Sequence, residues 1–200
     1  IDILVNNASA ISLTGTLETP LKRFDLMHGV NTRGTFACTQ ACLPHLLESP
    51  HPHVLTIAPP LNLDPRWFAP HVAYTLAKYG MSLCVLGMAE EFRSRGIAVN
   101  ALWPRTTIDT AALSLLGGAS TAARSRHPAI MADAAYAIFN KPSRAFTGRF
   151  LIDDTFLAGE GVTDFEQYRA VPGEPLAGTF FVPDLPPPPA GVVIDGKRWE

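Results

Sequence analysis

Two side chains with proton-transfer chemistry stand four residues apart in the stretch from His71 to Gly80. Tyr74 and Lys78 would lie on one face of a helix, because residues at i and i+4 are neighbours there. A phenol ordinarily titrates at about pH 10, and a nearby ammonium group favours the phenolate and lowers that pKa. Such a pair could move a proton on or off an alcohol oxygen. The spacing alone is only suggestive, since it also arises by chance.

Strands and helices alternate along the chain and must position this pair. The predicted strands cover residues 1–5, 53–58, 97–102 and 146–153, and the predicted helices cover residues 20–47, 71–95, 109–116 and 128–140. The segment 1–5 is nearly all apolar, which is typical of a strand covered on both faces in a parallel sheet. The alternation of strand and helix predicts an α/β fold with an open parallel sheet.

The composition is that of an ordinary globular protein. Apolar residues make up 47% of the 200 residues, charged residues 17%, and the net charge is −2. No basic patch indicates nucleic-acid binding, and no apolar run approaches the roughly 18 residues of a membrane span. Cys38, Cys42 and Cys84 fall in helical patterns without a disulfide framework, so we expect a soluble intracellular protein.

The chain begins without Met inside a predicted strand, which indicates a segment of a longer protein. We expect one domain over residues 1–153 and a C-terminal extension over residues 154–200, where the pattern fades. Residues 183–191 include four consecutive prolines and are predicted to be extended polyproline or disordered. A docking motif for a proline-recognising partner is conceivable there, but a plain tail or linker is the preferred interpretation.

Four motifs occur in a fixed order: ILVNNA at residues 3–8, VNTRGTF at 30–36, Y-x-x-x-K at 74–78 and VNALWP at 99–104. Together they resemble the short-chain dehydrogenase/reductase family over about residues 1–153. The stretches PPLNL, AYTLAKYGMS, LGMAEEF and NALWP are most similar to its hydroxysteroid-dehydrogenase-like group. The resemblance implies the C-terminal part of a Rossmann-like doubly wound parallel sheet, with four strands and flanking helices. It also implies hydride transfer between NAD or NADP and a secondary alcohol or ketone, including lipid-like ones, in the cytoplasm, a mitochondrion or a peroxisome.

The same resemblance implies roles for individual residues. Tyr74 would be the proton donor or acceptor, Lys78 would lower its pKa and hold the nicotinamide ribose, and Asn31 would anchor a water relay. The implied cofactor-binding positions are Asn6, Ala8, Ile57, Ala58, Tyr74, Lys78, Pro104, Arg105, Thr106 and Thr107. Most lie where parallel strands end, which is where such sheets bind ligands. For Asn31 the alternative is a helix kink satisfied by local hydrogen bonds.

The candidates on the substrate side are Asn62, Trp67, Phe68 and His71. Trp67 and Phe68 could wall an apolar pocket or simply pack their loop against the core. His71 could face the substrate or be a solvated residue at a helix start. Asp109 and Thr110 are expected to cap a helix. A histidine cluster of His45, His51 and His53 lacks a Cys or carboxylate to complete a ligand set, so no metal site is predicted.

Three departures from the family pattern weaken the enzyme interpretation. The family serine after the strand 53–58 is replaced by Ala58-Pro59-Pro60, and losing such a donor costs about 2.7–4 kcal/mol of transition-state stabilisation. Asn62 could substitute for it. Arg105 replaces a glycine, and an arginine there could reach a phosphate or a substrate carboxylate. The chain also contains no G-x-x-x-G-x-G or G-x-G-x-x-G turn to hold a pyrophosphate.

The leading hypothesis is an NAD(P)-dependent oxidoreductase acting on a small molecule, represented by its catalytic half. The alternative is a catalytically impaired fragment that serves as a dimerisation or interaction module. The helix 71–95 is apolar on more than one side, so a homo-oligomer through the two long helices is expected in either case. Residues 1–5 would form an exposed apolar edge. Non-redox chemistry such as halohydrin dehalogenation is disfavoured, because those enzymes resemble Y-x-x-x-R and keep the serine.

Overall fold

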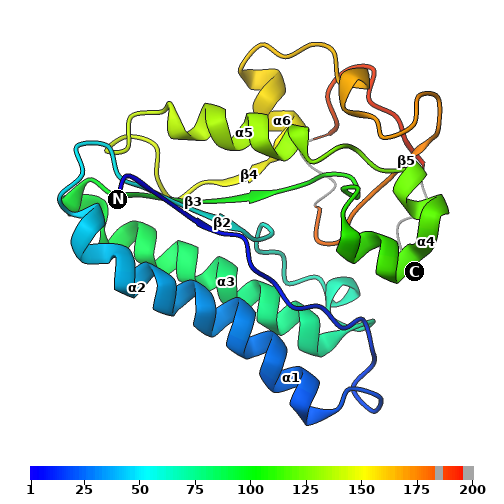
Figure 1. The fold of residues 1–200 in the computed structure, drawn as a ribbon, viewed down its shortest axis with the longest axis horizontal. Helices are drawn as coiled ribbons and strands as arrows, with labels where there is room; N and C mark the ends of the chain where they lie inside the picture. Colours follow the sequence, from blue (N-terminus) through cyan, green and yellow to red (C-terminus); the bar gives the residue numbers. More distant parts are fainter. Residues whose placement is uncertain (183–186, 196–200) are drawn as a thin grey trace. The chain divides into compact units, whose positions relative to one another are not determined.

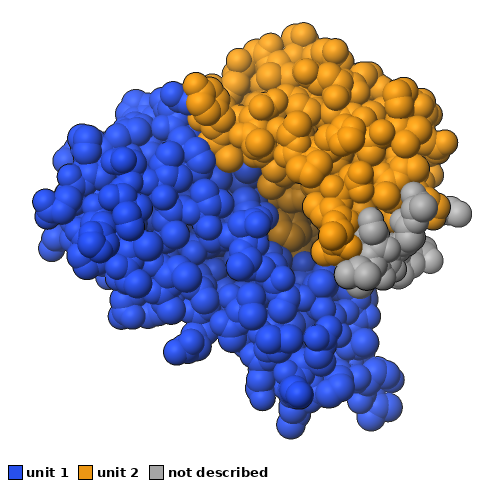
Figure 2. All heavy atoms as spheres, in the orientation of Figure 1, with its two compact units in different colours: residues 1–102, 139–150 blue, residues 103–138, 151–200 orange. Residues whose placement is uncertain are grey.

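The computed structural model describes residues 1–182 and 187–195, except for the side chains of residues 114–119. The chain divides into two compact units, which Figure 2 shows in different colours. Unit 1 comprises residues 1–102 and 139–150, and unit 2 comprises residues 103–138 and 151–200. These units do not follow the expected domain boundary at residue 153, which stays a prediction.

Parallel strands form the main sheet. β1 (Ile3–Asn6), β2 (His53–Ile57), β3 (Ala98–Trp103) and β4 (Phe150–Ile152) follow one another across it in that order. β1 runs parallel to β2 with Ile3 opposite His53, and β2 runs parallel to β3 with His53 opposite Ala98. All of β3 and the first four residues of β2 are buried, as the apolar runs predicted. The predicted α/β fold is confirmed.

β1 is the edge strand of the described sheet, and one of its faces is exposed to solvent, whereas Leu4 on the other face packs against the core. Ile3 and Val5 are 46% and 45% exposed, whereas Asn6 at the strand end is buried. The expectation that this strand is buried on both faces is wrong here, because the face that carries Ile3 and Val5 is exposed. No strand among the described residues pairs with the outer edge of β1. The exposed apolar edge that we predicted is present.

The single helix expected over residues 20–47 is divided into three segments. These are α1 (Leu21–His28), a π-helical turn (Gly29–Arg33) and α2 (Gly34–Leu46). Together with α3 (Val72–Glu91) they lie along one side of β1–β3 (Figure 1). α3 is followed by a 3-10 turn (Arg93–Arg95) and by Gly96, whose φ of +76° is a left-handed conformation that glycine adopts without strain.

α3 is long and apolar enough to cross a membrane by length and composition, but 61% of the qualifying window is buried inside the structure. Its Met81 and Val85 belong to the core cluster of unit 1, together with Val54 of β2 and Val99 of β3. A core helix satisfies the same length and composition test as a membrane span. The burial of α3 therefore explains its apolar character.

Unit 2 consists of short elements. They are α4 (Ala111–Ala123), α5 (Ala129–Phe139), α6 (Asp153–Gly159), a 3-10 turn (Glu166–Tyr168) and the parallel pair β5 (Leu176–Ala177) and β6 (Ile194–Asp195). The last residue of α5 belongs to unit 1. Thr110 caps α4, as expected, by accepting a hydrogen bond from the main-chain N of Leu113 (3.3 Å). This side-chain oxygen satisfies one of the amides that a helix start leaves unpaired.

Two expectations for the C-terminal part need correction. The strand predicted over residues 146–153 covers only Phe150–Ile152. It starts late because Gly148 takes a φ of +74°, and it ends early because α6 begins at Asp153. The segment after Asp154, where the sequence pattern fades, still forms most of α6, a 3-10 turn and the β5–β6 pair. Of the proline-rich segment, residues 183–186 lie outside the described residues, and residues 187–189 have no regular secondary structure.

Candidate active site

The first turns of α3 carry the proton-transfer pair. Tyr74 and Lys78 are one helical turn apart and buried, with exposed fractions of 5% and 3%. Nζ of Lys78 donates a hydrogen bond to the main-chain O of Ile57 (3.0 Å) and lies 3.7 Å from Sδ of Met81. Ile57 is the last residue of β2, so α3 brings the amine to the carboxyl end of a parallel strand. Sheets of this type bind their ligands at that end.

Burial controls the protonation of this pair. It raises the pKa of Tyr74 well above its ordinary value and lowers the pKa of Lys78 to about 7. Both shifts arise because a site removed from water disfavours the charged form of each group. The lowering of the Tyr74 pKa that the sequence suggested is therefore reversed in this structure. At pH 7 the phenol is protonated, and the amine is divided between its charged and neutral forms.

Asn31 is fully buried in the π-helical turn. Its Oδ1 accepts a hydrogen bond from the main-chain N of Ala10 (2.7 Å), and its Nδ2 donates one to the main-chain O of Ala10 (3.0 Å). These bonds reach 21 positions back along the chain, so local hydrogen bonds do not account for this side chain. π-helical turns inside α-helices are frequent at functional sites. Here the turn also fixes the segment that follows β1.

Gly80 allows the π-helical turn to approach α3 closely, and sequence reasoning missed it. Oγ1 of Thr32 donates a hydrogen bond to the main-chain O of Ala77 (3.1 Å). A Cβ atom on Gly80 would lie 2.2 Å from this Oγ1, far inside contact distance. The available signal was a glycine inside a long helix, since glycine weakens a helix interior by about 1 kcal/mol and usually has a packing or functional reason.

His71 precedes α3 and is buried beside Tyr74, with the two ring centres 5.7 Å apart in an edge-to-face arrangement. Nδ1 of His71 is 3.0 Å from Oγ1 of Thr75, whose only hydrogen is donated to the main-chain O of Trp67 (2.6 Å). The imidazole must therefore donate at Nδ1, and Nε2 is its unprotonated nitrogen. Burial lowers the pKa of His71, so the ring is neutral at pH 7. The interpretation as a solvated helix-start residue is wrong.

Three hydroxyl groups on one face of α3 hold the loop that follows β2. Each donates to a main-chain oxygen: Thr75 to Trp67 (2.6 Å), Tyr79 to Asn62 (2.7 Å) and Ser82 to Pro59 (2.7 Å). The spacing of four and then three residues places these donors on one helical stripe. The loop is therefore attached at its start, middle and end to the helix that carries the proton-transfer pair.

The substrate-side candidates within this loop differ in exposure. Trp67 is only 7% exposed, which supports packing of the loop against the core. Phe68 is half-buried and contacts the Tyr79 ring edge to face, with ring centres 5.3 Å apart. Oδ1 of Asn62 accepts a hydrogen bond from the main-chain N of Asp64 (2.9 Å). The side-chain oxygen of Asn62 thus shapes the loop itself.

The other predicted cofactor positions of unit 1 lie at the ends of β1 and β2 or just beyond them. Asn6 is buried, and its Nδ2 donates a hydrogen bond to Oγ1 of Thr39 on α2 (3.1 Å). Ala8 is exposed, Ile57 is half-buried and Ala58 is buried. Asn6 therefore braces the end of β1 against α2.

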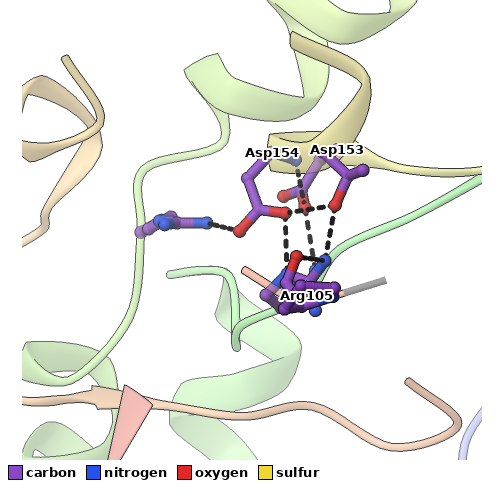
Figure 3. Close-up of polar contacts among 6 residues, drawn as sticks. Arg105, Asp153 and Asp154 are labelled. Atoms are coloured by element: carbon purple, nitrogen blue, oxygen red, sulfur yellow. Dashed lines mark hydrogen bonds and ion pairs between the residues drawn. The ribbon is translucent and has the colours of Figure 1, made fainter. Parts of the chain in front are cut away.

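In unit 2, Arg105 turns into the interior. Its Nε donates to Oδ1 of Asp154 (2.7 Å), and only 3% of the residue is exposed (Figure 3). The expectation that its guanidinium reaches a phosphate or a substrate carboxylate is wrong for this structure, because Asp154 pairs with it. Of the neighbouring loop residues, Pro104 is half-buried, and Thr106 and Thr107 are buried. The role of these main-chain segments in cofactor binding stays a prediction.

Two residues of the histidine cluster, His51 and His53, are hydrogen-bonded to each other. Nε2 of buried His53 is 3.1 Å from Nε2 of His51, which is also 2.9 Å from the main-chain O of Phe139. Burial lowers the pKa of His53 to about 4, and His45 is exposed on α2. Within residues 1–182 and 187–195, no group of three or more His, Cys, Asp or Glu side chains is arranged to hold a metal ion.

Known proteins are similar to this chain in sequence and in fold. The crystal structure of a short-chain dehydrogenase from Mycobacterium thermoresistibile superposes with a TM-score of 0.87 and is 52% identical, covering 98% of this chain and 69% of that one. The family model described as enoyl-(acyl carrier protein) reductase matches residues 1–150. The chain belongs to the short-chain dehydrogenase/reductase family. The resemblance carried by the four sequence motifs is thereby confirmed.

Other members of the short-chain dehydrogenase/reductase family are also similar. Hydroxysteroid dehydrogenase-like protein 2 of Danio rerio is 60% identical over 186 residues, which are 93% of this chain and 44% of that protein. The chain thus spans less than half the length of the curated relatives it matches. The angucycline C-6 ketoreductase LanV, solved with bound NADP, is 25% identical with a TM-score of 0.64, covering 76% of this chain and 61% of that one.

Proposed function

We propose that this chain carries the proton-transfer part of an NAD(P)-dependent site that interconverts a secondary alcohol and a ketone. The buried pair of Tyr74 and Lys78, attached to the carboxyl end of β2 at Ile57, is the observation that supports this function. A protonated phenol is the form that donates a proton to a ketone oxygen, and burial keeps Tyr74 in that form. In the oxidation direction the same phenol must first lose its proton.

The residues present fit the nicotinamide and ribose end of NAD or NADP. Lys78 offers an amine and Tyr74 a hydroxyl, both of which can donate hydrogen bonds to ribose oxygens. The half-buried Ile57 leaves the end of β2 partly accessible. When bound, the nicotinamide would supply or accept the hydride. The sequence contains no glycine-rich turn to hold the pyrophosphate, so this chain would provide only part of the cofactor grip.

Asn31 and His71 would support the pair in different ways. Two hydrogen bonds to Ala10 hold the Asn31 side chain in place, and we propose that a water relay involves the main chain of the π-helical turn. Such a turn shifts main-chain bonding from the i→i−4 pattern to i→i−5. His71 would present a neutral imidazole, with Nδ1 fixed by Thr75, next to the phenol of Tyr74.

An apolar, lipid-like substrate class fits the loop after β2. Its residues 59–63 include Pro59, Pro60, Leu61 and Leu63 and contain no hydroxyl. Without the serine of the family pattern, a ketone oxygen of the substrate would be oriented by Asn62 Nδ2. The unprotonated Nε2 of His71 can only accept a hydrogen bond, which suits the hydroxyl of an alcohol substrate. Since the missing serine donor contributes about 2.7–4 kcal/mol to transition-state stabilisation, slow turnover is expected.

The alternative function, a dimerisation or interaction module, is supported by exposed apolar side chains on the two long helices. Phe36 on α2 and Leu83 and Leu86 on α3 are 51%, 57% and 52% exposed. Such side chains are suited to packing against a second copy of the chain. Self-association of this kind is compatible with either function, so cofactor binding must discriminate between them.

Titration with NADH and NADPH, followed by nicotinamide fluorescence, tests the proposal. We expect micromolar saturation by one of the two cofactors in the protein as its gene encodes it, and weaker binding by Lys78→Met. Tyr74→Phe should lose turnover while binding the cofactor within about tenfold of wild type, because it keeps the ring and removes a single hydroxyl donor to the ribose. Absence of saturation at millimolar cofactor would overturn the oxidoreductase and favour the module. Lys22→Met on the exposed face of α1 is the matched control.

A further inference from the structure

The loop after β3 is fixed at Arg105, the position where the family pattern has a glycine. The main-chain N of Arg105 donates to Oδ1 of Asp153 (2.9 Å), and its main-chain O accepts from the main-chain N of Thr179 (3.0 Å). Both polar groups of this peptide segment are therefore occupied within unit 2. The conformation of the loop is set by unit 2 rather than by the freedom of a glycine.

The Arg105 side chain is held by the start of α6. Its Nε donates to Oδ1 of Asp154 (2.7 Å), and its Nη2 donates to Oγ1 of Thr155 (2.5 Å) and lies 3.5 Å from the main-chain O of Pro187. The second oxygen of Asp154, Oδ2, accepts from Nη1 of Arg126 (3.0 Å). Figure 3 shows Arg105 and the two aspartates pointing toward one another. One carboxylate thus bridges two arginines.

This bridge is almost free of solvent. Asp154 and Arg126 are fully buried, and the Arg105 side chain is 4% exposed. A buried guanidinium is tolerated when it is paired and hydrogen-bonded, and becomes strongly unfavourable when its partner is removed. Without the carboxylate of Asp154, Arg105 would have to turn toward water and take its main chain along. The inward direction of Arg105 therefore depends on Asp154.

We infer that Asp154 is a positioning residue for the cofactor loop: by drawing Arg105 inward, it holds residues 104–107 in the conformation that this structure shows. This inference rests on the proposed function, because it takes residues 104–107 as a cofactor-binding loop. It assigns Arg105 no contact with cofactor or substrate. Arginine at this position is accommodated because its side chain is buried on the side of Asp154.

The test compares wild type, Asp154→Asn, Arg105→Gly and the double variant, each in the protein as its gene encodes it. NADH affinity should fall about tenfold in Asp154→Asn and stay within about threefold of wild type in Arg105→Gly. The double variant should recover affinity despite its lower melting temperature, because position 105 then carries no side chain that could displace the loop. Asp195→Asn, at the exposed pair with Arg124, is the matched control and should leave affinity unchanged.

Limited trypsin digestion measures the accessibility of the same loop in the absence of a cofactor. Trypsin cleaves after arginine, so the bond between Arg105 and Thr106 should be resistant in wild type and cut in Asp154→Asn below its melting temperature. If Asp154→Asn lowers only the melting temperature, or if the double variant binds NADH as weakly as Asp154→Asn, the inference is overturned. If wild type binds no NADH, the proposed function fails, and the digestion pattern still decides whether Asp154 places Arg105.

Discussion

Two sites in this molecule bury ionisable side chains, and the two sites compensate for the loss of water in different ways. In unit 1, Tyr74 and Lys78 respond to the loss of water, which moves both pKa values in the direction of the neutral forms. In unit 2, Arg105 and Arg126 share the carboxylate of Asp154 at 2.7 and 3.0 Å. Similar burial thus leads to neutralisation in one place and to ion pairing in the other.

The difference separates a reactive site from a structural one. A group whose neutral and charged forms are close in free energy near pH 7 can exchange a proton at little cost, as acid–base chemistry requires. An ion-paired cluster cannot lose one of its charges without leaving a partner buried and alone. By this criterion Lys78 of the α3 pair is suited to exchanging a proton near pH 7, and the Asp154 cluster is suited to holding the chain in place.

The largest expected effect comes from breaking the paired cluster. Asp154→Asn removes the carboxylate that the two buried arginines share, so the free energy of unfolding should fall by about 3–5 kcal/mol. Urea denaturation at pH 7.5 measures this loss. Asp195→Asn removes the carboxylate from an exposed ion pair with Arg124 and should cost less than about 1 kcal/mol. Equal losses in the two variants would contradict the comparison.

The α3 pair should show the opposite behaviour, since it carries a charge that the folded state disfavours. Lys78 has a folded pKa of about 7, below its unfolded value, so the unfolded chain binds more protons between these values. Stability should therefore rise by about 2 kcal/mol from pH 7 to pH 9 in wild type. Lys78→Met, measured by urea denaturation across this range, should lose that rise.

The exposed Lys22→Met serves as the control for this measurement and should keep the rise. A rise that persists unchanged in Lys78→Met would show that another group causes it. The protonated phenol of Tyr74 does not interfere, because its raised pKa affects stability only at higher pH.

Asp153 sharpens the comparison. It lies beside Asp154, yet its pKa is shifted toward the neutral form, like the pKa values of Tyr74 and Lys78. Burial is the main reason that its pKa rises to about 6, and the charge of Asp154 adds to the shift. The folded state thus binds the proton more tightly, and stability should fall by about 2 kcal/mol between pH 4.5 and pH 7. Asp153→Asn should remove this fall in urea denaturation across the same range, while keeping an acceptor for the Arg105 amide.

His53 acts in the opposite direction in that range, because its lowered pKa makes stability rise with pH. The difference between variant and wild type, rather than the wild-type curve alone, therefore isolates Asp153. Parallel curves for Asp153→Asn and wild type would mean that the Asp153 carboxyl does not carry the extra proton.

The elements of unit 1 could be predicted because their signals are local. A Tyr and a Lys four apart define one helix face, and unbroken apolar runs define β2 and β3. Gly148, whose φ is positive, explains why β4 starts later than expected, and a glycine at this position is a signal that the sequence already contained. What an apolar run does not reveal is whether other parts of the fold cover both faces of the strand, which is why the burial of β1 was mispredicted.

The electrostatics of the site could not be predicted, because they depend on distant residues and on burial. Arg105 pairs with a carboxylate 49 positions later, and Asn31 bonds to Ala10, 21 positions earlier. Neither separation corresponds to a helix or strand period. The direction of the Tyr74 pKa depends on how much water reaches the phenol, and sequence spacing carries no measure of that.

The three hydroxyl bonds from α3 to the loop after β2 have a consequence for divergence within the family. Their acceptors are main-chain oxygens of Pro59, Asn62 and Trp67, which any amino acid at those positions would supply. The anchoring of the loop therefore does not depend on the identity of the residues it presents. Substitutions in the loop can therefore change the side chains that it presents while its attachment to α3 is kept, so this segment is suited to the evolution of new specificities.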